Sequence, residues 1–234
     1  MLPSPPAYGR GRRRRPRARR GRTAPVKIGG RDVSRQIPLA RGAALRAALA
    51  KVAPLERDGW VDRALGLGPP PDDGPALPRG CVPYLPCPVD ALLRLTEDAP
   101  VRASDVFIDV GAGVGRAAAL VHLLTGASVV GLEVQPQLVT VARELAARLC
   151  LPRVSFVEGD APQLTTALAS GSVFFLYCPF SGGRLEQLLA NLEPVARARD
   201  IRVCCLDLPL PPRRWLQPVP PRWPDLAVYR GGVP

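Results

Sequence analysis

The stretch Asp109-Val-Gly-Ala-Gly-Val-Gly115 constrains the fold of this chain more than any other segment. It follows the apolar residues 106–108, which indicate a buried strand, and it precedes residues 116–124, which indicate a helix. A strand, a glycine-rich turn and a helix form the opening of a βαβ nucleotide-binding unit. Glycine permits positive φ and lets a ligand approach the backbone closely. The sequence therefore predicts an α/β protein with a ligand at this turn.

The spacing of the glycines separates several kinds of cofactor loop. In a dinucleotide loop the third glycine comes three residues after the second, whereas Gly115 comes two residues after Gly113. A phosphate-binding loop needs Lys followed by Ser or Thr, and Arg116-Ala117 supplies neither. A tight turn in some other α/β protein is the alternative that this motif alone leaves open.

The pattern D-x-G-x-G-x-G resembles the first motif of the class I methyltransferases that depend on S-adenosylmethionine. The resemblance implies an α/β, Rossmann-like fold with a seven-stranded, mostly parallel sheet and helices on both faces. It implies S-adenosylmethionine as the cofactor, with Gly111, Gly113 and Gly115 as the floor of its site. A carboxylate at Asp109 suits the ammonium and sulfonium of that cofactor, because charge-assisted hydrogen bonds are the strong ones.

Two further acids follow predicted strands. Glu133 ends the apolar run 128–133, twenty residues after Gly113, near the offset at which an acid meets ribose hydroxyls in Rossmann-like sites. Asp160 follows the run 154–157 and, by the resemblance, is expected at the adenine amino group. The alternatives are a solvated strand-end residue for Glu133 and a turn-forming Gly-Asp pair for Asp160.

The apolar run 173–177 indicates a fourth strand, and Cys178-Pro179-Phe180 follows it. Many N-methyltransferases have Asn or Asp, Pro, Pro and an aromatic residue here, so the resemblance implies that Tyr177, Pro179 and Phe180 border the methyl acceptor. The chain departs from that motif, because Tyr177 and Cys178 stand where the amide and the first proline are expected. Tyr177 or strand-end carbonyls then replace the amide. The alternative for Phe180 is core filling.

A second resemblance concerns the segment before the first strand. Tyr84-x-Pro-x-Pro88, a helical stretch and Asp105-Val-Phe107 precede the glycine loop. This arrangement is similar to protein-lysine methyltransferases of the non-SET histone type and of the type that modifies the ATP-synthase c subunit. It implies that Tyr84 closes over the cofactor and that the acceptor is a protein lysine. A stiff, extended linker is the alternative for Tyr84, and small-molecule or nucleic-acid acceptors remain open.

The C-terminal third completes the expected sheet. A helix is predicted from Arg184 to about Glu193, and the run 201–206 predicts a fifth strand. Two short runs, 214–219 and 225–230, are expected to pair as the antiparallel strands that close it. We expect this methyltransferase domain to span residues 81–234.

Nine arginines and no acids between residues 10 and 22 account for most of the net charge of +12. Residues 1–30 are therefore expected to be a disordered tail, whose stretch 10–22 makes at most a weak electrostatic contact with nucleic acid. Residues 31–80 are expected to form a helical extension and a Pro/Gly linker. A non-catalytic cofactor-binding module held to nucleic acid by this tail is an alternative function.

The six cysteines and the single histidine, His122, do not have the spacing of a zinc site, and we expect no metal. The cysteine pattern favours a reducing compartment, so a cytoplasmic location is expected. No apolar run is long enough for a membrane span. The expected partner is a protein substrate or a small-molecule acceptor. A nicotinamide oxidoreductase is disfavoured by the glycine spacing.

Overall fold

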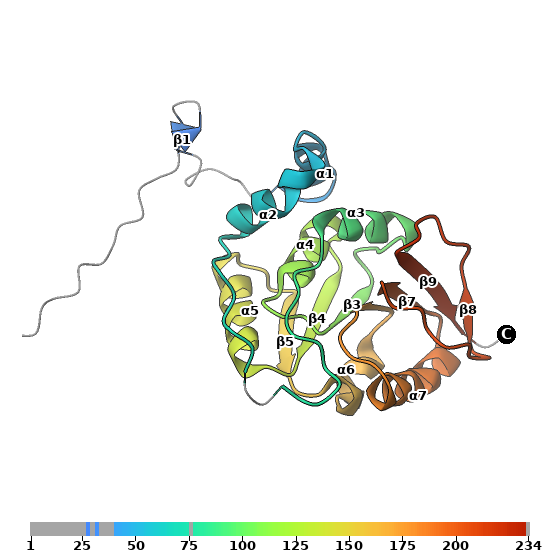
Figure 1. The fold of residues 1–234 in the computed structure, drawn as a ribbon. Helices are drawn as coiled ribbons and strands as arrows, with labels where there is room; N and C mark the ends of the chain where they lie inside the picture. Colours follow the sequence, from blue (N-terminus) through green and yellow to red (C-terminus); the bar gives the residue numbers. More distant parts are fainter. Residues whose placement is uncertain (1–26, 29–30, 33–39, 75–76, 233–234) are drawn as a thin grey trace, which may run out of the picture. The chain divides into compact units, whose positions relative to one another are not determined.

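The strands that the sequence predicts form one seven-stranded sheet (Figure 1). Its members are β3 (Val106–Val110), β4 (Ser128–Glu133), β5 (Val154–Glu158), β6 (Val173–Tyr177), β7 (Ile201–Leu206), β8 (Leu216–Pro218) and β9 (Leu226–Gly231). Their order is β5-β4-β3-β6-β7-β9-β8, with β9 antiparallel to β7 and to β8 and every other pair parallel. The predicted mostly parallel sheet and the pairing of its last two strands are confirmed.

This computed structural model describes residues 27–28, 31–32, 40–74 and 77–232. Residues 1–37 form a separate unit, in which β1 (Lys27–Ile28) pairs antiparallel with β2 (Arg31–Asp32). The predicted disorder of residues 1–30 and the arginine-rich stretch 10–22 thus lie almost wholly outside the described residues. Within the described ranges, no helix is both long and apolar enough to span a membrane.

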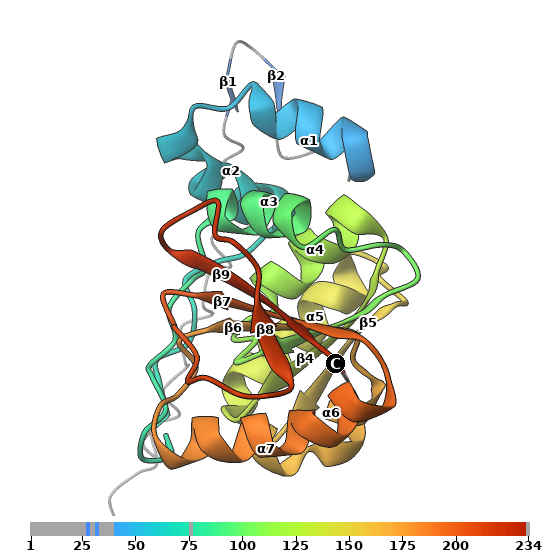
Figure 2. The same cartoon turned by 90° about the vertical axis from the view of Figure 1, so that its right-hand side faces the viewer.

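Helices cover both faces of the sheet (Figure 2). They are α1 (Gly42–Ala50), α2 (Arg57–Leu65), α3 (Val89–Asp98), α4 (Arg116–Thr125), α5 (Pro136–Arg148), α6 (Thr165–Ser170) and α7 (Gly183–Ala198), with short 3-10 turns at Pro54–Glu56 and Ala161–Gln163. Buried residues of α1 to α5 join one apolar cluster, and those of α6 and α7 join a second cluster on the other face. This two-sided cover matches the predicted layer arrangement.

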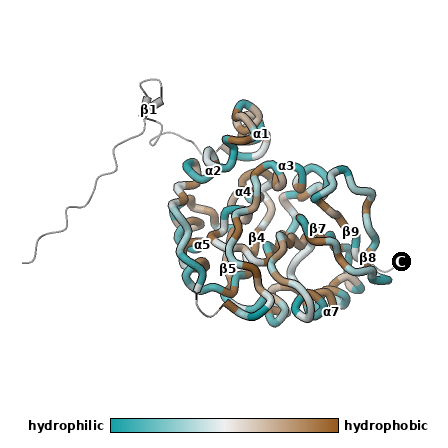
Figure 3. Tube along the Cα trace, viewed as in Figure 1, coloured by the Kyte–Doolittle hydropathy of each residue, from teal (hydrophilic) through white to brown (hydrophobic). Residues whose placement is uncertain are grey.

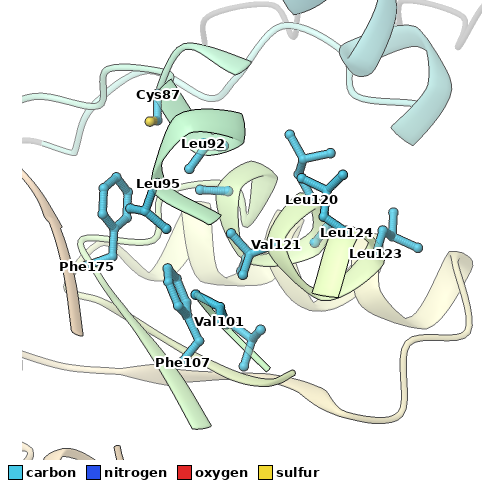
Figure 4. Packing of buried hydrophobic residues seen from close by; sticks show 14 of the residues in the cluster. Cys87, Leu92, Leu95, Val101, Phe107, Leu120, Val121, Leu123, Leu124 and Phe175 are labelled. Atoms are coloured by element: carbon cyan, nitrogen blue, oxygen red, sulfur yellow. The ribbon is translucent and has the colours of Figure 1, made fainter. Parts of the chain in front are cut away.

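Alternate side chains of each strand enter opposite clusters, as the period of two in a strand requires. In β3, Phe107 packs with the α3–α4 face and Ile108 with the α7 face. Phe107 stacks on Phe175 of β6 at a centroid distance of 6.0 Å, and Figure 4 shows both rings beside Leu95 and Val121. The sheet is drawn largely in the hydrophobic colour in Figure 3. Burial on both faces explains why the strands appear in the sequence as nearly continuous apolar runs.

The structure corrects one predicted boundary. The helix predicted to end near Glu193 continues through Pro194 to Ala198 as α7. Proline normally disfavours a helix interior, so the continuation past Pro194 needs support from packing. Leu192 and Ala196 are both buried against the sheet on the same helix face, and that packing holds the last turn in place.

Candidate active site

A cavity opens at the carboxyl ends of the parallel strands, where β4 and β6 flank β3 on opposite sides. This is the point at which ligands bind in open α/β sheets, because the strand order reverses there. The cavity is lined by eight of the ten predicted site residues: Tyr84, Asp109, Gly111, Glu133, Asp160, Tyr177, Pro179 and Phe180. Segments far apart in the sequence therefore meet at one place.

The two remaining predicted glycines, Gly113 and Gly115, are not among the residues that line this cavity. All three loop glycines have positive φ, at 82° for Gly111, 54° for Gly113 and 79° for Gly115. A Cβ on Gly113 would overlap the ring of Tyr84, and one on Gly111 would lie 2.9 Å from Cβ of Pro179. A Cβ on Gly115 would instead lie 2.6 Å from the ring of Phe156. Gly115 leaves room for the packing of Phe156, and its place in the cofactor floor stays a prediction.

Asp109 is the least satisfied polar group of the site. Its side chain is buried, and Oδ2 has no hydrogen-bond partner within the described part of the chain. Burial, and secondarily the nearby charge of Glu133, raises the pKa of Asp109 to about 7. A buried carboxylate oxygen without a partner is costly, so a cationic ligand that satisfies it gains affinity. This group fits the ammonium end of S-adenosylmethionine.

Glu133 is held by the backbone on both sides of its carboxylate. Oε2 accepts a hydrogen bond from the N–H of Gly113 at 2.9 Å, and Oε1 accepts one from the N–H of Gln135 at 2.9 Å. Each carboxylate oxygen can accept a second hydrogen bond. Glu133 therefore fixes the glycine loop and retains capacity for two ribose hydroxyls.

Asp160 has a protein partner. Its carboxylate forms an ion pair with Arg184 in the first turn of α7, and Arg184 also donates to the carbonyl of Arg79 at 3.1 Å. Asp160 lines the cavity nonetheless, so a contact with adenine stays a prediction.

An extended segment borders the opening of the cavity, and we call residues 71–74 and 77–88 the strap. In Figure 1 the chain after α2 runs past α5 and returns towards α3. The strap pairs with the acceptor-side loop, because Val82 N–H donates to the carbonyl of Pro179 at 3.1 Å and Cys81 bridges Phe180. Tyr84 of the strap is half-buried against Gly113, and burial raises its pKa to about 12. The hydroxyl of Tyr84 therefore stays protonated, and its ring lies over the glycine loop.

The acceptor side contains Tyr177, Pro179 and Phe180. Tyr177 is partly buried, and desolvation raises its pKa. Phe180 is only 5% exposed and packs in the α7-side cluster, so it fills the core while it borders the cavity. Cys178 has the left-handed φ of 43°, and its Sγ lies 3.1 Å from the carbonyl oxygen of Asp207. Non-glycine residues in this conformation concentrate at functional sites.

Sequence reasoning missed Arg116, which lines the same cavity. Its guanidinium is 4% exposed and pairs with Asp62 at 2.7 Å and with Asp58 at 2.8 Å, both on α2. It also donates to the carbonyl of Cys87 in the strap. A buried cation needs such partners, so α2 and the strap are fastened to the first residue of α4.

Sequence reasoning also missed Gln135, which is buried at 5% exposure beside Glu133. No group of three or more His, Cys, Asp or Glu side chains converges as a metal site anywhere in the described ranges. The cavity therefore offers a carboxylate-rich, partly apolar surface made of ordinary side chains and backbone groups.

Comparisons with known proteins agree with this geometry. A family model described as a methyltransferase domain matches residues 107–199. The chain is similar to an RNA methyltransferase from Salinibacter ruber solved with S-adenosyl-L-homocysteine, at 27% identity and a TM-score of 0.52, over 64% of this chain and 94% of that one. It is also similar to the putative methyltransferase yhhF from Escherichia coli, at 19% identity and a TM-score of 0.52, over 64% and 92%. No curated protein matches the chain.

The sheet order, the glycine loop, the orphaned carboxylate of Asp109 and the matched domain point to one conclusion. The class I resemblance that the sequence motif indicated is confirmed at the level of fold and cofactor. Residues 107–199 match a methyltransferase domain, the chain has the α/β fold of class I methyltransferases, and the comparisons support S-adenosylmethionine as the cofactor.

Proposed function

We propose that this enzyme transfers a methyl group to an acceptor nitrogen, and that the nitrogen belongs to a lysine of a protein. The observation that carries the transferase part is the buried carboxylate oxygen of Asp109 without a partner, at the strand end beside the glycine loop. When bound, S-adenosylmethionine would supply a methyl group on a sulfonium; the acceptor nitrogen would form the new bond to that carbon in line with the sulfur, and S-adenosylhomocysteine would leave as the neutral thioether. The chain supplies alignment and exclusion of water, and alignment alone contributes about 7–11 kcal/mol in favourable cases.

Each cofactor-binding residue has a distinct task in this proposal. Asp109 binds the methionine end, Glu133 binds the ribose, and Asp160 binds the adenine while Arg184 fixes its carboxylate. Tyr84 covers the glycine loop from the strap side. Gly111 leaves room for the acceptor loop, because any side chain there would meet Pro179.

The opening of the cavity favours a long aliphatic acceptor. Val82 and Leu85 of the strap line the cavity and are 45% and 56% exposed, which is unusual for large apolar residues. A lysine side chain has an apolar stem and a polar tip, so it packs along such residues while its nitrogen reaches inward. Tyr177 ends β6 on the acceptor side of the cavity, and desolvation raises the pKa of its phenol. The similarity of the Tyr84 and Asp105 segments to lysine methyltransferases supports the same acceptor.

The test is transfer from cofactor labelled at the methyl group to a cell extract, followed by acid hydrolysis and amino-acid analysis. Label recovered as methyl-lysine supports the proposal. Glu133→Ala is the matched control, because it removes the ribose ligand and the support of the Gly113 N–H together. Label that survives hydrolysis on other residues, or no label in protein, contradicts a lysine acceptor.

RNA is the second candidate acceptor. The similar structure from Salinibacter ruber is described as an RNA methyltransferase, and the nine arginines of residues 10–22 suit phosphates, although they lie outside the described residues. In the same extract, label removed by ribonuclease and retained after protease favours RNA. Binding of the cofactor with no transfer to either fraction favours a non-catalytic module.

Free cysteines are consistent with the reducing cytoplasm that we propose as the location of this protein.

A further inference from the structure

The side-chain amide of Gln135 has a single orientation that its partners determine. Oε1 accepts from the N–H of Gly74 at 2.8 Å and from the amide of Gln137 at 2.9 Å. Nε2 donates to Oδ1 of Asp73 at 2.7 Å. A backbone N–H only donates and an ionised carboxylate only accepts, so one end of this side chain must accept and the other must donate.

Asp73 connects Gln135 to the strap backbone at Tyr84. Its Oδ1 also accepts from the N–H of Tyr84 at 3.0 Å. The hydrogen bond from Gln135, followed by the one from Tyr84, lowers the pKa of Asp73. The carboxylate therefore stays ionised at neutral pH and holds the strap backbone at Tyr84.

The contacts close into a circuit of five residues. The ring of Tyr84 covers Gly113, the N–H of Gly113 donates to Glu133, and Glu133 accepts from the N–H of Gln135. Gln135 binds Asp73, and Asp73 binds Tyr84. The predicted ribose ligand and the predicted cofactor cover are thus joined through one buried amide.

We propose that Gln135 is a positioning residue that couples the strap to the cofactor site. Without its donor, Asp73 loses the partner that orders it, Tyr84 no longer lies on Gly113, and the site opens to water. The cofactor then dissociates faster, although the two predicted contacts Glu133 and Tyr84 have not changed. This inference rests on S-adenosylmethionine being the cofactor and on Glu133 being its ribose ligand.

Gln135→Glu is the sharpest test, because it keeps the shape and the acceptor for Gly74 but turns the donor into a second carboxylate facing Asp73. We expect S-adenosylhomocysteine, measured by calorimetry at pH 8, to bind roughly tenfold more weakly. In the protein without ligand, the backbone amide of Tyr84 should exchange hydrogen faster. Gln217→Glu makes the same chemical change at an exposed position of β8 and should alter neither readout.

The pH profile separates this role from a general loss of structure. Two facing carboxylates share one proton at lower pH, because repulsion raises the pKa of one of them. The ratio of wild-type to Gln135→Glu affinity should therefore fall towards one as the pH is lowered from 8 to 5. Asp73→Asn in the Gln135→Glu background should remove the repulsion between the two carboxylates but recover binding only in part, because the single position of Oδ1 faces both Gln135 and Tyr84.

Should Gln135→Glu fail to fold, Asp73→Ala tests the same circuit from an exposed position and should free the Tyr84 amide. Wild-type affinity together with unchanged Tyr84 exchange in Asp73→Ala overturns the inference, and the same result in a folded Gln135→Glu protein also overturns it. If the wild-type protein itself does not bind S-adenosylhomocysteine, the cofactor assignment has failed instead, and the exchange measurements still decide whether Gln135 orders the strap.

Discussion

The ring of Tyr84 occupies the space that a side chain on Gly113 would need, so the strap closes only because position 113 is glycine. Gly113→Ala should displace the ring and weaken binding of S-adenosylhomocysteine at least tenfold. It should also lower the free energy of unfolding by about 1 kcal/mol, because the φ of 54° disfavours alanine. Calorimetry and thermal unfolding measure the two effects.

Gly126→Ala is the matched control for that variant. Gly126 also has a positive φ, 76°, but a Cβ there comes no closer than 3.4 Å to Ala103. It should lose similar stability and keep full ligand affinity. Equal affinity losses in both variants would show that backbone strain, and not the Tyr84 contact, decides binding.

Ligand affinity should rise with pH around neutrality. The pKa of Asp109 is raised to about 7, so the carboxylate is mostly protonated at pH 6 and mostly ionised at pH 8. Binding of the ligand's ammonium favours the ionised form, so protons should be released on binding near pH 6.5. Calorimetry in two buffers of different ionisation enthalpy counts them. Asp109→Asn should bind weakly and release fewer protons, and equal release from both proteins would contradict the assignment.

The same carboxyl makes the free protein less stable at high pH. An acid whose folded pKa lies above its unfolded value of 3.8 contributes stability below pH 4, and that contribution is lost as the pH rises through 7. A pKa shift of about three units corresponds to a change on the order of 4 kcal/mol in the free energy of unfolding. Asp109→Asn without ligand should therefore exceed the wild type in stability at pH 8 and differ little at pH 4. Urea unfolding at both pH values decides this.

Arg116→Met should destabilise the fold strongly. The guanidinium is buried, forms ion pairs with Asp58 and Asp62 and donates to the carbonyl of Cys87. Its loss should therefore cost about 3 kcal/mol in free energy of unfolding. Arg197→Met removes an exposed pair with Glu193 within one helix and should cost less than about 0.5 kcal/mol. Similar midpoints of chemical denaturation for the two variants would refute the anchoring role of Arg116.

Local pattern was sufficient to predict the sheet. The bounds of β4, β6 and β7 agree with the predicted runs, because strands buried on both faces are continuously apolar. The end of α7 was missed, since its continuation past Pro194 depends on packing of Ala196 against the sheet. Helix α6 was missed as well, because a single buried residue, Leu168, gives no period.

The sequence predicted the site residues that lie at strand ends. It did not predict contacts between side chains that are far apart in the sequence. Asp109, Glu133 and Tyr177 each end a strand or lie beside the glycine loop, so topology brings them together. Gln135 and Asp73 are 62 residues apart, and nothing in either neighbourhood indicates the other. The individual binding roles of the predicted residues stay predictions that the variants above address.

The anchoring of α2 has a practical consequence for anyone who shortens this gene. The matched domain begins at residue 107, and the domain expected from the sequence begins at residue 81, but Asp58 and Asp62 precede both points. A fragment that starts at either place keeps the guanidinium of Arg116 inside the protein and discards both of its counter-ions. Family boundaries are therefore a poor guide for truncation here, and an expression clone should begin upstream of α2.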